Sequence, residues 1–218
     1  MDRKQAFTFA EIIVTILIIG VVAAVTIPGL RQNVLHNTYA ENLKKIYSEL
    51  NAASTKYLAD QNVNNFCRTD SITAGQAEFE KKFILPYLNV VTICPAGDIS
   101  KCFGTSEIVP NTITNTYLLS NGIALAFATI GGATEPCAST RANDDTLLYV
   151  YIDVNGPKLP NKVAVDQYTM YLKKDGTTYF PGVTNNSVEN ACRTTTNSLI
   201  KSMVCARAIQ ENGWRYTK

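Results

Sequence analysis

The feature that most constrains this chain is an almost wholly apolar run of 21 residues near its start, residues 7–27. As a helix such a run is about 32 Å long at 1.5 Å per residue, which is enough to cross a bilayer. Arg3 and Lys4 precede it, opposed only by Asp2. This charge pattern predicts that residues 1–6 stay in the cytoplasm and that the rest of the chain is exported.

The run contains one carboxylate, Glu11, which needs an explanation. A charge at the centre of a bilayer costs about 2.5–3.5 kcal/mol even on the scales that give low values. Between Lys4 and Arg31 the sequence has no basic residue that could act as its partner. A cut after Ala6 would create an α-amino group on Phe7, and this group would be the missing cation.

This segment resembles the class III signal of type IV prepilins and of the pseudopilins of type II secretion. The resemblance covers residues 4–28 and begins with a short basic leader and a small residue before the cut. Counted from Phe7 as residue one, Glu11 is the fifth residue, Gly20 the fourteenth and Pro28 the twenty-second, which are the family's positions for these residue types. Ala6 stands where the family more often has glycine.

The resemblance implies that a membrane aspartyl peptidase removes the leader between Ala6 and Phe7 and then methylates the Phe7 nitrogen. It also implies that Glu11 pairs with the Phe7 ammonium of a neighbouring copy when the helices pack into a fibre. Breaking one partner of a buried ion pair typically costs about 3–5 kcal/mol, so the pair can set the register of the subunits. Further implied partners are an inner-membrane assembly platform and an assembly ATPase.

Three simpler interpretations remain open. The segment could be an ordinary secretory signal that is cut after a small residue such as Ala24. It could also be an N-terminal anchor that is never processed. Glu11 itself could be a carboxylate that is tolerated at the membrane interface without a partner.

The periodicity predicts one helix over residues 7–59, about 80 Å long at 1.5 Å per residue. Residues 7–28 form its membrane or filament-core half, with Gly20 and Pro28 predicting a kink or a locally unwound stretch. Residues 29–59 form an amphipathic half, in which apolar residues recur at helical spacing: Leu35, Tyr39, Leu43, Ile46, Tyr47, Leu50, Ala53 and Tyr57.

The remaining residues, 60–218, predict a globular head with four to five antiparallel strands. The pattern favours a short helix interrupted near Pro86, two hairpins, a strand between them and a final helix ended by Gly213. The residues concerned are helix 76–91, a hairpin about Asn121-Gly122, strand 146–154, a hairpin over 167–180 about Asp175-Gly176, helix 198–212 and the packing anchor Trp214. The fold class is therefore α+β, and the resemblance implies that this sheet packs on the long stalk helix as in pilins.

Six cysteines in an exported chain predict disulfides in an oxidising compartment. The sequence has no Cys-x-x-Cys pair and a single histidine, His36, which makes a zinc site improbable. Six cysteines allow 15 pairings. Their spacing favours Cys94–Cys102 and Cys192–Cys205 as local loops, and this leaves Cys67–Cys137.

Composition and motifs exclude several functions. The net charge is +2, or +1 without the leader, which argues against a nucleic-acid binder that depends on bulk phosphate attraction. No nucleophile–histidine arrangement and no phosphate-binding glycine loop can be argued, so we expect no enzyme activity. Asp153, Asn155 and Asp166 offer oxygen ligands around a Gly- and Pro-rich loop, which would suit calcium. The alternative is a turn whose Asp and Asn side chains bond to local backbone.

The expected function is that of an exported, single-pass protein of the bacterial inner membrane that polymerises through its N-terminal helix. The fibre would be a type IV pilus or a secretion pseudopilus, and the sequence leaves this choice open. One alternative is a minor pilin that acts as a tip or competence receptor. Another is a membrane-anchored binding protein or enzyme that does not polymerise.

Overall fold

A computed structural model of the chain describes residues 8–69, 75–129, 137, 145–182 and 187–216. The chain divides into two compact units, Met1–Thr38 and Tyr39–Lys218. Helix α1, Phe9–Asp60, contributes residues to both units. The long helix predicted from the periodicity is therefore confirmed.

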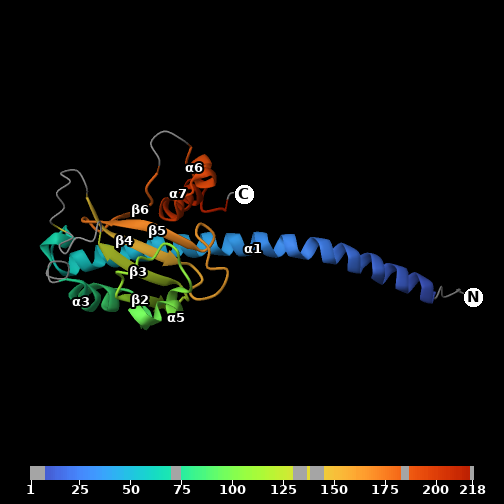
Figure 1. Cartoon of the computed structure of the whole chain (residues 1–218), viewed down its shortest axis with the longest axis horizontal. Helices are drawn as coiled ribbons and strands as arrows, with labels where there is room; N and C mark the ends of the chain where they lie inside the picture. Colours follow the sequence, from blue (N-terminus) through green and yellow to red (C-terminus); the bar gives the residue numbers. More distant parts are fainter. Residues whose placement is uncertain (1–7, 70–74, 130–136, 138–144, 183–186, 217–218) are drawn as a thin grey trace, which may run out of the picture. The chain divides into compact units, whose positions relative to one another are not determined.

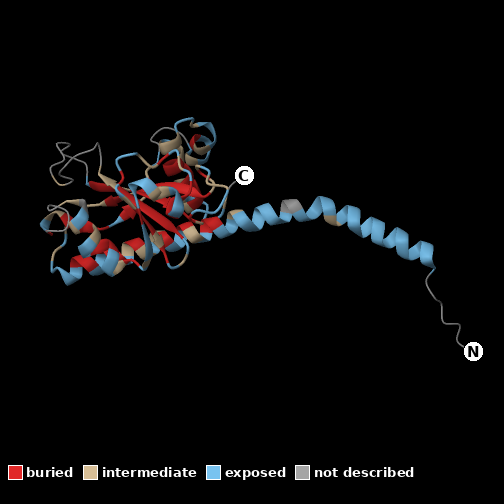
Figure 2. Ribbon diagram, turned by 60° about the horizontal axis from the view of Figure 1, so that its bottom comes forward, coloured by how far each residue is buried: buried red, intermediate tan, exposed pale blue. Residues whose placement is uncertain are grey.

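Helix α1 is unbroken at Gly20 and Pro28. The locally unwound stretch, one of the two effects predicted for these residues, is absent, while a kink stays a prediction. Figure 2 shows how the residues of α1 change along the helix from exposed to buried. Leu35, which the periodicity places on the apolar face of the helix, is 43% exposed and belongs to the first unit.

The second unit contains a six-stranded antiparallel sheet in which each strand pairs with the next along the chain. Its strands, in sequence and in spatial order, are β1 (Val90–Pro95), β2 (Asn115–Leu119), β3 (Ala124–Thr129), β4 (Thr146–Asp153), β5 (Gln167–Lys173) and β6 (Thr178–Tyr179). The α+β class is confirmed, with one strand more than the expected four to five.

The additional strand is β1, which sequence reasoning assigned in part to the helix over residues 76–91. The helical turns end at Tyr87, after α3 (Gln76–Phe79), the π-helical stretch η2 (Glu80–Ile84) and α4 (Leu85–Tyr87). The next residues are mostly β-branched and pair with the edge of β2, which favours a strand. Glu80 holds η2 on β2, because it accepts hydrogen bonds from Asn115 (2.6 Å) and the Tyr117 hydroxyl (2.7 Å).

Both predicted hairpins are present. Gly122, with φ +83°, lies in the turn between β2 and β3, where the Ile123 N–H donates to Asn121 Oδ1. Gly176, with φ +85°, lies between β5 and β6, where the Thr177 N–H donates to Asp175 Oδ1. A positive φ carries no steric cost for glycine, which is why these turns follow from the sequence.

One face of the sheet packs on the part of α1 that belongs to the second unit (Figure 1). Leu43, Ile46 and Leu50 of α1 are fully buried there, in one core with Val150 and Met170 of the sheet. Burying such a side chain stabilises the fold by about 1.5–3 kcal/mol relative to leaving it exposed. The apolar residues that recur at helical spacing therefore form the contact between α1 and the sheet.

The other face of the sheet carries a short helix and the first part of the last helix. Phe103 of α5 (Ile99–Phe103) packs with Ala126 and Tyr151 of the sheet in a second apolar cluster. On α7 (Ser198–Glu211), the Ser202 hydroxyl donates to Thr169 Oγ1 of β5 at 2.8 Å. The remaining short elements are η1 (Phe66–Arg68), η3 (Ala96–Asp98) and α6 (Val188–Thr194).

The C-terminal end of α7 follows the sequence prediction. Gly213, with φ +67°, comes after the last turn, and the Trp214 N–H donates to the Ile209 carbonyl at 2.8 Å. The Trp214 ring lies 5.4 Å from the Tyr47 ring and 6.3 Å from the Phe180 ring, between centroids. Trp214 is therefore a packing anchor.

Three disulfides cross-link the second unit. They join Cys67 to Cys137, Cys94 to Cys102 and Cys192 to Cys205. The spacing of the cysteines favoured Cys94–Cys102 and Cys192–Cys205, and Cys67–Cys137 is the pair that this choice left. The first closes a loop with a sequence separation of 70, whereas the other two span 8 and 13 residues.

Candidate functional site

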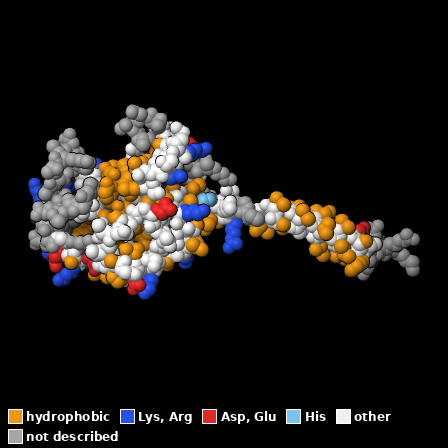
Figure 3. Space-filling view, in the orientation of Figure 1, with side chains coloured by type: hydrophobic (Ala, Val, Ile, Leu, Met, Phe, Trp, Pro, Cys, Tyr) orange, Lys and Arg blue, Asp and Glu red, His pale blue; other side chains and the backbone are white. Residues whose placement is uncertain are grey.

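The first part of α1 exposes an apolar surface that no described residue of its own unit covers. The best 18-residue window has a mean hydropathy of 2.7, and none of its residues is buried. Phe9, Ile16 and Val25 are 79%, 64% and 76% exposed. Figure 3 shows hydrophobic side chains over the visible face of this part of the helix. By length and composition, the described residues thus contain one helix that could cross a membrane.

Glu11 takes part in a local arrangement that the sequence analysis missed. Its Oε2 accepts hydrogen bonds from the backbone N–H and the hydroxyl of Thr8, both at 2.8 Å. The Glu11 N–H donates in return to Thr8 Oγ1 at 3.3 Å. This reciprocal pattern is a capping box, and Thr-x-x-Glu is its sequence signal. The carboxylate therefore has a partner within its own chain.

Two of the predicted site residues, Ala6 and Phe7, lie outside the described residues. Cleavage between them, methylation of Phe7 and the pairing of its ammonium group with Glu11 therefore stay predictions. Gly20 lies in the exposed half of α1, and a Cβ atom added there would meet no atom within 4 Å. The described residues therefore give no steric reason for a glycine at this position.

The loop between β4 and β5 brings together the three residues proposed as calcium ligands. Asp153 and Asp166 are both fully buried. Asp166 accepts from the backbone N–H groups of Asn161 (2.8 Å) and Lys162 (2.6 Å), one on each carboxylate oxygen. Asp153 accepts from the Asn155 N–H (3.2 Å) and from Gln167 Nε2 (3.0 Å). All four carboxylate oxygens thus hold the loop by accepting N–H donors.

Asn155 completes this network as a donor. Its Nδ2 group donates to the Tyr39 hydroxyl at 3.1 Å and to the Lys158 carbonyl at 2.9 Å. Tyr39 lies on α1, so the network ties the loop to the helix. Sequence reasoning missed the polar roles of Tyr39 and Gln167, because periodicity marks Tyr39 only as a core residue and gives no signal for Gln167.

The electrostatics of this network follow from its burial. Burial raises the pKa of Asp153 to about 8, against the hydrogen bond from Gln167, and the neighbouring Asp166 adds to the rise. Burial also raises the pKa of Asp166, although the N–H groups of Lys162 and Asn161 oppose the rise. Amide donors converge on these carboxylates from several sides. A cation would have to displace them, so the arrangement fits the alternative of a turn held by its own side chains.

The described residues contain no group of three or more His, Cys, Asp or Glu side chains placed to hold a metal ion. Asn155 Oδ1, Asn161 Oδ1 and Gln167 Oε1 are buried without a hydrogen-bond partner among the described residues. These oxygens are the only observation in the loop that favours a cation. Calcium binding stays a prediction.

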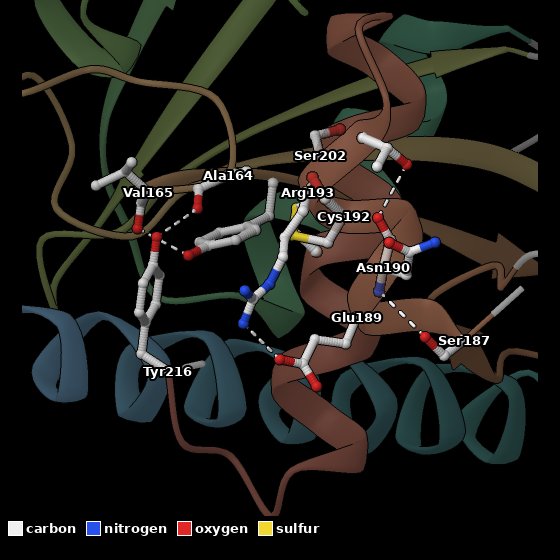
Figure 4. The surroundings of a disulfide bond; sticks show 12 residues. Ala164, Val165, Ser187, Glu189, Asn190, Cys192, Arg193, Ser202 and Tyr216 are labelled. Carbon is white, nitrogen blue, oxygen red and sulfur yellow. Dashed lines mark hydrogen bonds and ion pairs between the residues drawn. A yellow bond between two sulfur atoms is a disulfide. The ribbon is translucent and has the colours of Figure 1, made fainter. Parts of the chain in front are cut away.

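The Cys192–Cys205 disulfide joins α6 to α7 beside the sheet (Figure 4). Around it, Arg193 pairs with Glu189 at 2.7 Å, and the Asn190 N–H donates to Ser187 Oγ at 3.2 Å. The disulfide thus links two helices. The sequence predicted α7 but not α6.

No family model, no curated protein and no solved structure matches this chain.

Proposed function

We propose that this chain is an exported, single-pass subunit that polymerises through α1 into a type IV pilus-like or type II secretion pseudopilus fibre. The observation that carries the proposal is the contrast within α1. Its first part is exposed and apolar with one carboxylate, Glu11, and residues from Tyr39 onward form the core of a disulfide-bonded domain. A helix of this kind has to bury its first part in lipid or against other helices.

Lipid and other copies of the helix are both compatible with this surface, at successive stages. In the proposed pathway the monomer is stored in the inner membrane with its sheet domain outside. A prepilin peptidase cuts between Ala6 and Phe7, and an assembly platform with its ATPase then moves the helix into the fibre. Each step comes from the resemblance of residues 4–28 to prepilin signals.

The capping box does not conflict with this pathway. Losing a capping bond costs about 0.5–2 kcal/mol, whereas leaving one partner of a buried ion pair without the other costs about 3–5 kcal/mol. In a fibre, pairing Glu11 with the Phe7 ammonium of a neighbouring copy would therefore be more favourable than keeping the capping bond. In the stored monomer, Thr8 keeps the same carboxylate bonded.

Mass analysis of the N-terminus of the mature protein tests the processing step. The expected species begins at N-methylated Phe7. A mature protein that begins at Met1 would identify an unprocessed anchor, and one that begins at Val25 would identify an ordinary secretory signal.

A pair of substitutions at Glu11 tests the assembly step. Glu11→Gln keeps a side chain that can complete a capping box but removes the charge, whereas Glu11→Ala removes both. If the charge pairs with a neighbouring subunit, fibres counted by electron microscopy should be lost in both variants. Fibres that persist in Glu11→Gln and fail only in Glu11→Ala would reduce Glu11 to a capping residue. Fibres that persist in both would refute the proposal.

Calcium binding at Asp153, Asn155 and Asp166 is a separate hypothesis, and the N–H donors around the carboxylates weigh against it. Calorimetric titration with CaCl₂ tests it, with MgCl₂ as the matched control. A calcium-specific heat that disappears in Asp166→Asn would establish the site. The absence of any such heat would leave the turn interpretation.

A further inference from the structure

A polar cavity of about 470 Å³ opens beside the Cys192–Cys205 disulfide. Its walls come from the loop after α5, from the segment that follows Pro160 and from the link between α6 and α7. The lining residues are Glu107, Asn161, Lys162, Val163, Arg193, Thr194, Thr195, Thr196, Ser198 and Lys201. We propose that this cavity binds a small phosphate-bearing ligand.

The chemistry of the walls selects the ligand class. Three of the ten lining residues are cationic, one is acidic, five carry a hydroxyl or amide group, and only Val163 is apolar. Pockets that bind apolar ligands are lined mostly by hydrophobic side chains, and this one is not. Hydroxyl, amide and ammonium groups together are the donors that a phosphate group accepts from.

The charges in the cavity do not cancel. Arg193 pairs with Glu189 at 2.7 Å, and Glu107 accepts a hydrogen bond from the Ser198 hydroxyl at 3.1 Å. Lys162 and Lys201 form no ion pair with any residue in the described part of the chain. Cationic groups without an ion-pair partner raise the local concentration of anions around them.

The walls are held in place before any ligand arrives. The Cys192–Cys205 disulfide fixes α6 to α7, and Arg193 lies next to it in Figure 4. In the segment that follows Pro160, Asp166 accepts from the backbone N–H groups of Asn161 and Lys162. The first turn of α7 is capped by the Asn197 side chain, which accepts a hydrogen bond from the Ile200 N–H. A site built in this way loses little entropy when it binds.

Calorimetric titration of the full-length protein in detergent tests the site, with sodium phosphate and glycerol 3-phosphate as probes and sodium chloride at equal ionic strength as the blank. The two probes distinguish a free phosphate from a phosphate ester such as a lipid headgroup. Lys162→Ala and Lys201→Ala should each weaken binding about tenfold, the loss expected for one charge-assisted hydrogen bond.

Two further variants make the test specific. Glu107→Gln keeps an acceptor for Ser198 but removes the negative charge, so it should tighten binding. Lys45→Ala removes an exposed cation on α1 and should leave binding unchanged. Heat no larger than that of the chloride blank would overturn the proposal. Equal losses of phosphate affinity in Lys162→Ala and Lys45→Ala would also overturn it. Because the fibre proposal does not depend on this cavity, either result leaves it standing.

Discussion

Thr8 and Glu11 bond to each other at the start of α1: the Thr8 N–H and hydroxyl donate to Glu11 Oε2, and the Glu11 N–H donates to Thr8 Oγ1. This box satisfies backbone groups that a helix start otherwise leaves without partners. It also gives the carboxylate in the apolar run a polar partner before any second copy is present. The same two residues thus serve the folding of one chain and, in the proposed fibre, the contact between chains.

Thr8→Val should fray the first turn of α1, because valine has the shape of threonine without the capping hydroxyl. The expected cost is about 0.5–2 kcal/mol of local helix stability, and Thr8→Ser should retain most of it. Amide hydrogen exchange of Phe9 to Ile12 in detergent micelles would measure the difference. Equal exchange in the two variants would mean that the hydroxyl does not cap the helix.

The stability of the second unit should fall as the pH rises from about 4 to about 8. Folded Asp153, with its pKa raised to about 8 by burial, keeps a proton that the unfolded chain has already lost near its usual value of 3.8. The unfolded state then binds fewer protons, and the free energy of unfolding drops by at most about 1.4 kcal/mol per pH unit. The raised pKa of Asp166 acts in the same direction.

The variant Asp153→Asn tests whether Asp153 causes this pH dependence, since asparagine cannot ionise. Urea unfolding between pH 5 and pH 9, followed in detergent, should show a flatter dependence in the variant than in the original protein. Asp145→Asn, at an exposed acid beside the start of β4, is the matched control and should keep the full dependence. An unchanged slope in Asp153→Asn would assign the effect to other groups.

Gly156→Ala should destabilise the fold more than Gly213→Ala. Both glycines have a positive φ, +64° and +67°, so both variants carry the strain of a left-handed residue, about 1–2 kcal/mol. At Gly156 the new Cβ would also lie 2.8 Å from the Gly122 carbonyl oxygen, whereas at Gly213 it would meet nothing within 4 Å. Urea unfolding measures the loss of stability in each variant, and the difference between the two losses is the cost of the contact with the Gly122 carbonyl. Equal losses would mean that this contact costs nothing.

Removing the Cys67–Cys137 disulfide should cost more than removing Cys94–Cys102. In the chain-entropy description the cost grows with the loop that is closed, giving about 4 kcal/mol for a separation of 70 and about 2.5 kcal/mol for 8. Paired Cys→Ala variants, unfolded by urea under oxidising conditions, would measure both losses. The reverse order would mean that native contacts around the short loop outweigh chain entropy.

Local signals in the sequence predicted much of the fold. The helical spacing of Tyr39, Leu43 and Ile46 predicted the face of α1 that the sheet covers, and Asn121-Gly122 predicted a hairpin. Strand β1 was missed because the predicted helix was extended to Val91, although the residues from Val90 to Ile93 are β-branched and pair with the edge of β2. The capping box of Thr8 and Glu11 has a sequence signal, Thr-x-x-Glu, but Glu11 was interpreted only as an ion-pair partner of Phe7.

By itself the sequence determined the apolar run with its single carboxylate and the long helix, and the spacing of the cysteines favoured the two short disulfide loops. These features depend on residue type and on short distances along the chain. Only the tertiary structure decided that Asp153, Asp166 and Gln167 form one buried network with Tyr39, and that Lys162 and Lys201 share a cavity. Residues far apart in sequence meet through the packing of the sheet on α1 and α7, and no local propensity encodes which polar groups that packing brings together.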